Sequence, residues 1–418
     1  MKVLLVHDYG TPTGGAERQM LALRDGLRAR GHEVRLFASD ASLVPSPSSA
    51  DDHCFGTTTR LQVLTQVVNP SAVVQLRRVL HRFRPDVVHV RMMLWQLSPA
   101  ILPLLRGRAA LYQAATYKAI CPTGTRLLPD GSACTLRAGT ACLSRGCLTP
   151  QSWVPAMLQR ALWARGRSVF GAIVALSDGM RAQLEAHGLG PVRVIHNGVA
   201  VRPPRVHTPH DTGGVVPTIA YAGRLVREKG VHVLVDAFAA VRRGLEARLL
   251  ILGDGPARTA LEAQVRALGL TDAVAFTGYL DRERMEATLE QATLQVVPSL
   301  WDEPFGNVTT EAMMRGTPVI ASAVAGQRDI VRDGVDGFLV PPGDAETLAV
   351  RMRTLVLDAA LADRLGAAGR ARALADFSEA SCVARFEELY RELIAARVAH
   401  ASGSGRDAAT VSAAGWAT

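Results

Sequence analysis

Two carboxylates flank a loop-to-helix turn in the stretch 296–316, which reads VVPSLWDEPFGNVTTEAMMRG. Glu303 comes before the predicted helix and Glu311 lies inside it, with seven residues between them. Asn307 is a candidate N-cap for this helix. Gly306 lets the backbone approach a ligand closely, and the free N–H groups of a new helix turn form an anion site. Acids that can bind hydroxyls, placed beside a phosphate site, suit a sugar nucleotide.

Two cations follow another short apolar strand, which begins at Thr218. The next loop, from Gly223 to Gly230, reads Gly-Arg-Leu-Val-Arg-Glu-Lys-Gly and holds Arg224 and Lys229. In a parallel sheet, ligands bind at the carboxyl ends of the strands, so both cations are placed to meet one. Fixed cations of this kind stabilise negative charge as it develops on a departing diphosphate.

Together the two motifs resemble those of the family 4 retaining glycosyltransferases, which have the two-domain GT-B fold. The resemblance implies that Glu303 contacts the donor sugar and the reacting region, and that Glu311 holds the ribose diol. It also implies that Arg224 and Lys229 bind the donor diphosphate. The other residues that it brings to the donor are Phe305, Gly306, Asn307, Val308 and Gly223 in the second half of the chain, with Gly14 and Gly15 in the first.

The implied reaction moves a sugar from a nucleoside diphosphate to an acceptor hydroxyl, with retention at the anomeric carbon. An Asp-x-Asp triplet, through which metal-dependent transferases hold the diphosphate, is absent from all 418 residues. We therefore expect metal-independent chemistry with no required cofactor. The acceptor could be a glycan, a lipid-linked intermediate or a small natural product. Two alternatives stay open: a non-catalytic protein that binds sugar nucleotides, and a sugar-nucleotide epimerase or hydrolase on the same fold.

The first half of the chain departs from the family at two positions. Many members have His-Asp-Tyr where this chain has Ala115-Thr116-Tyr117, and Arg91 stands where a second His is common. The first His normally lies beside the reacting sugar, so no obvious general base remains. Either the acceptor loses its proton directly to the departing phosphate, or His89, Lys118 or His7 assists. Each histidine could instead be a structural group at a strand end.

Four of the six cysteines fall within one loop-rich insertion, residues 118–150. They are Cys121, Cys134, Cys142 and Cys147, separated by twelve, seven and four residues. This density is compatible with a structural zinc site, with two disulfides or with unligated thiols. The lack of a Cys-x-x-Cys pair weakens the case for zinc, and cytoplasmic disulfides are uncommon. The insertion resembles a Cys-containing loop on the acceptor side in a subset of these transferases.

The order of the elements predicts an α/β protein of two Rossmann-like, doubly wound domains. The first 40 residues read as strand, Gly-rich turn, amphipathic helix and strand, which is a unit of a parallel sheet. We expect an acceptor-binding domain over 1–205 and a nucleotide-sugar domain over 206–385. A closing helix at 386–399 and a disordered tail at 400–418 follow. Asn197, in an Asn-Gly turn before the domain boundary, is a further acceptor-side candidate.

Charge is distributed unevenly along the chain. The formal net charge is +9, and residues 1–200 hold 23 Lys and Arg against 11 Asp and Glu. This half could favour an anionic acceptor or a peripheral membrane contact, although Arg on solvated faces is the simpler interpretation. Nucleic-acid binding is not expected, because aromatic and glycine-rich RNA motifs are missing. No targeting segment or membrane span is visible, so we expect a cytoplasmic protein, and the oligomeric state is not indicated.

Overall fold

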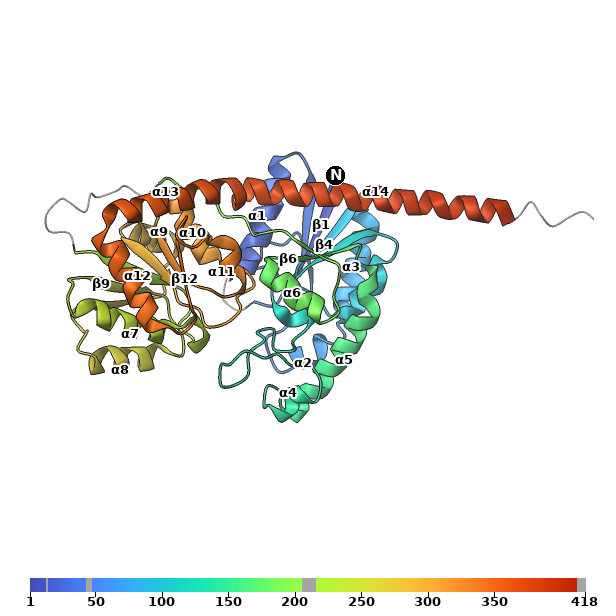
Figure 1. The fold of residues 1–418 in the computed structure, drawn as a ribbon. Helices are drawn as coiled ribbons and strands as arrows, with labels where there is room; N and C mark the ends of the chain where they lie inside the picture. Colours follow the sequence, from blue (N-terminus) through green and yellow to red (C-terminus); the bar gives the residue numbers. More distant parts are fainter. Residues whose placement is uncertain (13, 43–46, 205–215, 412–418) are drawn as a thin grey trace, which may run out of the picture.

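Two parallel β-sheets, each flanked by helices, make up the body of the protein (Figure 1). The computed structural model describes residues 1–12, 14–42, 47–204 and 216–411, with side chains described up to residue 400. All pairings between the named strands are parallel over these residues. The predicted α/β class with two doubly wound sheets is confirmed.

The first sheet has seven strands in the order β3-β2-β1-β4-β5-β6-β7. Its strands are β1 (Lys2–Tyr9), β2 (Glu33–Ser39), β3 (Asp52–Cys54), β4 (Val87–Val90), β5 (Ala109–Gln113), β6 (Ala172–Ala175) and β7 (Val192–Val194). Its α-helices are α1 (Gly15–Ala29), α2 (Gln62–Thr65), α3 (Pro70–Phe83), α4 (Ala141–Ser144), α5 (Pro150–Gly166) and α6 (Asp178–Ala186). The central strands are almost continuously apolar, as expected for a sheet that helices cover on both faces.

The second sheet has six strands in the order β10-β9-β8-β11-β12-β13. They are β8 (Thr218–Ala222), β9 (Arg248–Leu252), β10 (Val274–Gly278), β11 (Leu294–Val297), β12 (Val319–Ser322) and β13 (Phe338–Val340). The helices are α7 (Val231–Arg242), α8 (Arg258–Ala267), α9 (Arg282–Glu290), α10 (Asn307–Arg315), α11 (Ala325–Ile330), α12 (Ala345–Leu357) and α13 (Ala359–Asp376). The strand order reverses between β1 and β4 and between β8 and β11, and ligands of doubly wound sheets bind at such switch points.

A long helix, α14 (Glu379–Val411), connects the second sheet back to the first (Figure 1). Val383, Phe386 and Tyr390 on this helix are buried in one cluster with residues of β1, β2 and α1. Glu387 pairs with Arg30 at 2.6 Å and with His32 at 3.1 Å. The start of α14 is therefore part of the core of the first domain. None of the described helices is long and apolar enough to cross a lipid bilayer.

Two segments differ from the sequence-based expectation. Strand β3 was not expected, because its three residues include two polar ones; it forms the sheet edge by pairing with β2. The closing helix, expected at 386–399, begins at Glu379 and continues beyond residue 400 to Val411, into the segment expected to be disordered. Residues 379–399 of this helix are rich in Ala, Glu and Arg, which favour helix. The predicted boundary at residue 205 and the end of the tail, 412–418, lie outside the described residues.

Gly230 is the N-cap of α7, and its backbone conformation requires glycine. Its φ is +68°, and a Cβ there would lie 1.9 Å from the carbonyl oxygen of Pro298. Gly230→Ala is expected to lower the free energy of unfolding by about 3 kcal/mol or more, because both the backbone conformation and the contact oppose a side chain. Denaturant titration measures this change. Gly244→Ala is the control, since a Cβ beyond the other end of α7 meets nothing closer than 3.6 Å; equally stable variants would contradict this packing.

Candidate functional site

The two sequence motifs meet in one ion pair. Lys229 Nζ lies 2.7 Å from Glu303 Oε1, and Ser299 Oγ donates a hydrogen bond to the same oxygen. Glu303 is 7% exposed and Ser299 is fully buried, so the carboxylate is largely shielded from water. Lys229 belongs to the loop after β8 and Glu303 to the loop after β11, and these strands are neighbours in the sheet. Both contacts fall on Oε1, and no described residue donates a hydrogen bond to Oε2, which leaves it for a ligand.

Arg224 lies on the same loop as Lys229, directly after Gly223. Its carbonyl oxygen accepts a hydrogen bond from the Tyr221 hydroxyl at 2.9 Å, which fixes the backbone. A Cβ at Gly223 would lie 2.7 Å from that hydroxyl, so the turn requires glycine. The Arg224 side chain is exposed and has no ion pair or hydrogen bond with a described residue. Its guanidinium is therefore available to an anion.

The start of α10 differs from expectation in its cap. Gly306, with φ of 151°, is the N-cap, and Asn307 is the first helical residue. The prediction that Asn307 caps the helix is wrong, because its side-chain oxygen accepts a hydrogen bond from Asn197 Nδ2 at 3.0 Å. A Cβ at Gly306 would lie 2.6 Å from Gln327 Nε2, so the chain passes too closely for a side chain. No side chain caps α10, so its first N–H groups can meet an anion.

Two further residues expected near the donor support this turn by packing. Phe305 is 3% exposed, and its ring stacks on His196 with centroids 5.7 Å apart and meets Phe377 edge-on. Val308 is partly buried against two apolar clusters. The Phe305 side chain is thus enclosed in the core, where it holds the loop that carries Glu303.

The Gly-Gly turn of the first domain lies against the start of α10. Gly14 is the N-cap of α1, and a Cβ at Gly15 would lie 3.0 Å from Asn307 Nδ2. A Cβ at Gly14 would lie 2.6 Å from Glu17 Oε2. The structure therefore brings this turn to the helix that carries the second acid.

Glu311 lies on α10 in a setting that disfavours its charge. Burial raises the pKa of the Glu311 carboxyl, and the nearby Glu286 carboxylate raises it further. Arg315, Arg282 and Arg18 oppose this shift. A carboxylate in such a place gains from hydroxyl donors, which stabilise its charge by hydrogen bonds.

Arg91, which stands where a His is common in the family, is linked to the second domain through Asn197. It is 2% exposed, and its guanidinium donates to Gln113 Oε1 and to Asn197 Oδ1, each at 3.0 Å. Asn197 in turn donates to Asn307. Burial lowers the pKa of Arg91 to about 10, so the side chain stays charged at neutral pH. Asn197, expected on the acceptor side, is 3% exposed and its side chain is used in this bridge.

The two histidines considered as general bases are fully buried. The ring nitrogens of His89 lie 2.7 Å from the Tyr390 hydroxyl and 3.1 Å from Gln113 Oε1. Burial, and then the charge of Arg91, lowers the pKa of His89 and of His7 to about 3. The expectation that His89 serves the acceptor side is therefore wrong. It is a structural group between β4 and α14.

Lys118 is held by its own loop. Its Nζ donates to the Pro122 carbonyl oxygen at 2.5 Å and lies 3.9 Å from the centroid of a Trp95 ring. Burial lowers the pKa of Lys118 to about 8, although Asp8 acts in the opposite direction. Of the side chains considered as bases, Lys118 is thus the one that titrates near neutral pH.

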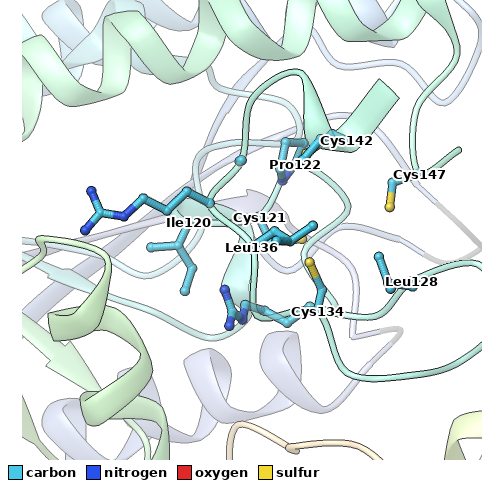
Figure 2. A pocket seen from close by; sticks show the side chains of 12 residues that line it. Ile120, Cys121, Pro122, Leu128, Cys134, Leu136, Cys142 and Cys147 are labelled. Atoms are coloured by element: carbon cyan, nitrogen blue, oxygen red, sulfur yellow. The ribbon is translucent and has the colours of Figure 1, made fainter. Parts of the chain in front are cut away.

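None of the six cysteines forms a disulfide. Cys121, Cys134, Cys142 and Cys147 nevertheless line one small pocket in the 118–150 insertion (Figure 2). As the side chains stand, no three His, Cys, Asp or Glu residues in the described ranges are arranged to hold a metal ion.

Several contacts of the site lie outside the sequence motifs. Ser299 could have been recognised as a polar residue at the end of an apolar strand, four positions before Glu303. Ser177 caps α6 and also donates to the Pro304 carbonyl oxygen at 2.8 Å. Its N-cap position is visible in the sequence, whereas its contact with the loop of Glu303 depends on how the domains meet.

Comparisons with known proteins agree with this arrangement. The family described as Glycosyltransferase Family 4 matches residues 13–202, and the one described as Glycosyl transferases group 1 matches residues 210–372. The phosphatidyl-myo-inositol mannosyltransferase of Mycobacterium leprae is 30% identical over 387 residues, which cover 85% of this chain and 87% of that protein.

Solved structures share the fold. A sucrose-phosphate synthase from Thermosynechococcus elongatus matches with a TM-score of 0.70 at 25% identity, covering 95% of this chain and 100% of that one. HepE of Anabaena, solved with UDP and glucose, matches with a TM-score of 0.66 at 20% identity, covering 93% of this chain and 98% of that one. The chain therefore belongs to the family 4 glycosyltransferases and has their GT-B fold.

Proposed function

We propose that the protein is a retaining glycosyltransferase that moves a sugar from a nucleoside-diphosphate sugar to an acceptor hydroxyl without a metal ion at the diphosphate. The observation that carries this proposal is the Lys229–Glu303 ion pair, because it joins the cation motif to the acid motif. Sugar transfer follows from the family. The retention, the metal independence and the role of each residue are inferred from the site.

Arg224 and Lys229 neutralise the donor diphosphate. The Arg224 guanidinium has no competing partner in the described part of the chain, and the Lys229 side chain is 27% exposed beside Glu303. The uncapped start of α10 adds N–H donors. Cations fixed by the fold can stabilise the leaving group in place of a metal ion, which agrees with the absence of an Asp-x-Asp triplet.

Glu303 and Glu311 bind different parts of the donor. Lys229 and Ser299 hold Oε1 of Glu303, so Oε2 is left to accept hydrogen bonds from sugar hydroxyls. Glu311 lies about one turn into α10, where burial and Glu286 disfavour its charge. Two ribose hydroxyls relieve this penalty by donating hydrogen bonds to its carboxylate.

The acceptor proton passes to the departing phosphate. His7 and His89 are enclosed, and Ala115 packs in an apolar cluster with Tyr9 and Met92. The acceptor oxygen therefore attacks the anomeric carbon from the side on which the phosphate oxygen leaves, so configuration is retained. The bond to phosphate breaks, the bond to the acceptor forms, and the proton moves to a phosphate oxygen. Lys118 is the competing base.

A thermal-shift screen against UDP, GDP, ADP and TDP tests the donor site. One nucleotide at about 100-fold over its dissociation constant is expected to add ~2.7 kcal/mol of stability, a readily visible shift. The shift should persist with EDTA, because Arg224 and Lys229 replace the metal. A shift that EDTA abolishes would contradict metal independence, and no shift with any nucleotide would contradict the donor site.

The nucleotide that binds then selects sugar donors for turnover assays with candidate acceptors. A product with the donor's anomeric configuration, read by NMR, is the expected outcome. Inversion would overturn the proposed mechanism. Consumption of donor without acceptor would indicate an epimerase or hydrolase, and binding without turnover would indicate a sugar-nucleotide-binding protein.

A further inference from the structure

The four cysteines of the 118–150 insertion surround one cavity of about 20 Å³ (Figure 2). That is room for a single water-sized species and too little for an organic ligand. The insertion has little regular structure apart from α4 and a single bridge between Leu127 and Ala133. A long loop inside a compact domain needs another source of order, such as a metal or a covalent link.

Cys121 is surrounded by hydrogen-bond donors. Its Sγ lies 3.1 Å from the Thr123 hydroxyl. Hydrogen bonds from that hydroxyl and from the backbone of Arg126, Thr123 and Gly124 also reach this sulfur. Donors directed at a sulfur favour the thiolate, which is the form that binds metals.

The four thiols also affect one another. All four line one small cavity, so thiolates gathered here would repel each other. A divalent cation removes this repulsion. Four thiolates and one such cation carry two negative charges, and Arg126 and Arg137 line the same cavity with two positive ones. The two arginines therefore balance the net negative charge that four thiolates and one divalent cation would carry.

We propose that Cys121, Cys134, Cys142 and Cys147 bind one zinc ion that closes the insertion. Four cysteines in a tetrahedron are a typical structural zinc site, with zinc–sulfur distances of about 2.3 Å. The thiols as they stand do not form such a site, so binding turns them inward onto the cavity. Each thiol that binds as a thiolate releases its proton to solvent.

The zinc ion would order a hairpin that contacts the loop of the donor site. The tip of this hairpin is Asp130-Gly131, and a Cβ at Gly131 would lie 3.6 Å from Arg227 Cδ. Hydrogen bonds from Ser132 lower the pKa of Asp130, and the charge of Arg227 adds to this. Arg227 lies between Arg224 and Lys229, so this consequence rests on the proposed function. Zinc binding itself does not.

Metal analysis of the full chain, purified under reducing conditions from zinc-supplemented cells, tests the site. The wild type is expected to hold about one zinc per chain, and Cys134→Ser/Cys147→Ser none. Cys382→Ser is the matched control, because this cysteine lies on α14 outside the cluster. Cobalt added to the metal-free wild type should give the visible absorption of tetrahedral thiolate coordination.

Zinc retained by the double variant, or a folded wild type that takes up neither zinc nor cobalt, would overturn the proposal. If the mass of the unreduced chain were lower by two hydrogens for each linked pair of cysteines, the cysteines would form disulfides instead. If the double variant does not fold, the cobalt spectrum of the wild type still decides. None of these readouts uses transferase activity, so this proposal and the proposed function can fail separately.

Discussion

Replacing Arg224 or Lys229 by Ala is expected to lower kcat/KM for sugar transfer by about 100- to 1,000-fold each, the usual loss when a group that stabilises transition-state charge is removed. Both side chains come from the loop after β8, at a switch point of the second sheet. The negative charge on the diphosphate increases as the sugar departs, so much of the loss should appear in kcat. Steady-state kinetics with the donor found by the nucleotide screen measure it.

Lys229→Ala also removes the partner of Glu303, whose carboxylate is 7% exposed. The double variant with Arg224→Ala is therefore expected to lose less than the product of the two single losses, because the groups act as one unit. Arg266→Ala is the control, since this exposed side chain lies on α8, away from both motifs. Transfer rates within about threefold of wild type for both single variants would contradict the assigned roles.

Much of the proposed donor site could be predicted because its residues lie in local patterns. The run Leu294–Val297, apolar except for Gln295, marks β11, and the parallel sheet places the loops after β8 and β11 at the same edge. That is enough to bring Lys229 near Glu303. Gly223 and Gly306 follow from the same logic, because each stands where the chain turns tightly between a strand and a helix.

The connections between the domains could not be predicted, because they join residues that are far apart in the sequence. Asn197 of the first domain and Asn307 of the second are 110 residues apart, and Arg91, which holds Asn197 within the first domain, is 106 residues from it. The sequence offered Asn307 as a helix cap, which is its most common local role. The tertiary hydrogen bond from Asn197 overrides that preference. Arg91 appeared as an unexplained departure from the family, and only the fold shows its two amide partners.

The burial of His89 also could not be predicted from the local sequence. A histidine near the end of a strand is a reasonable candidate base, and local sequence gives no sign of what covers it. The residue that encloses it, Tyr390, lies 301 positions away on α14. Its burial therefore depends on the return of the last helix to the first domain.

Glu303→Gln and Glu311→Gln are expected to separate catalysis from nucleotide binding. The amide at position 303 keeps the shape of the side chain but loses the charge that faces Lys229 and, in the proposed site, the donor sugar. We expect kcat to fall by about 100- to 1,000-fold, while the affinity for the nucleoside diphosphate alone changes little, because this ligand has no sugar for Glu303 to hold. Calorimetric titration and steady-state kinetics on the same preparations measure the two effects.

Glu311→Gln should show the opposite pattern. Losing charge-assisted hydrogen bonds to the ribose, worth about 1.5–3 kcal/mol, is expected to weaken nucleoside-diphosphate binding by about 10- to 100-fold. The ligand-free variant should be at least as stable as the wild type, because burial and Glu286 already disfavour the Glu311 carboxylate. A stable variant that binds poorly separates a ribose contact from a folding role. If Glu303→Gln instead weakened nucleotide binding and Glu311→Gln spared it, the two acids would have to exchange their assigned parts of the donor.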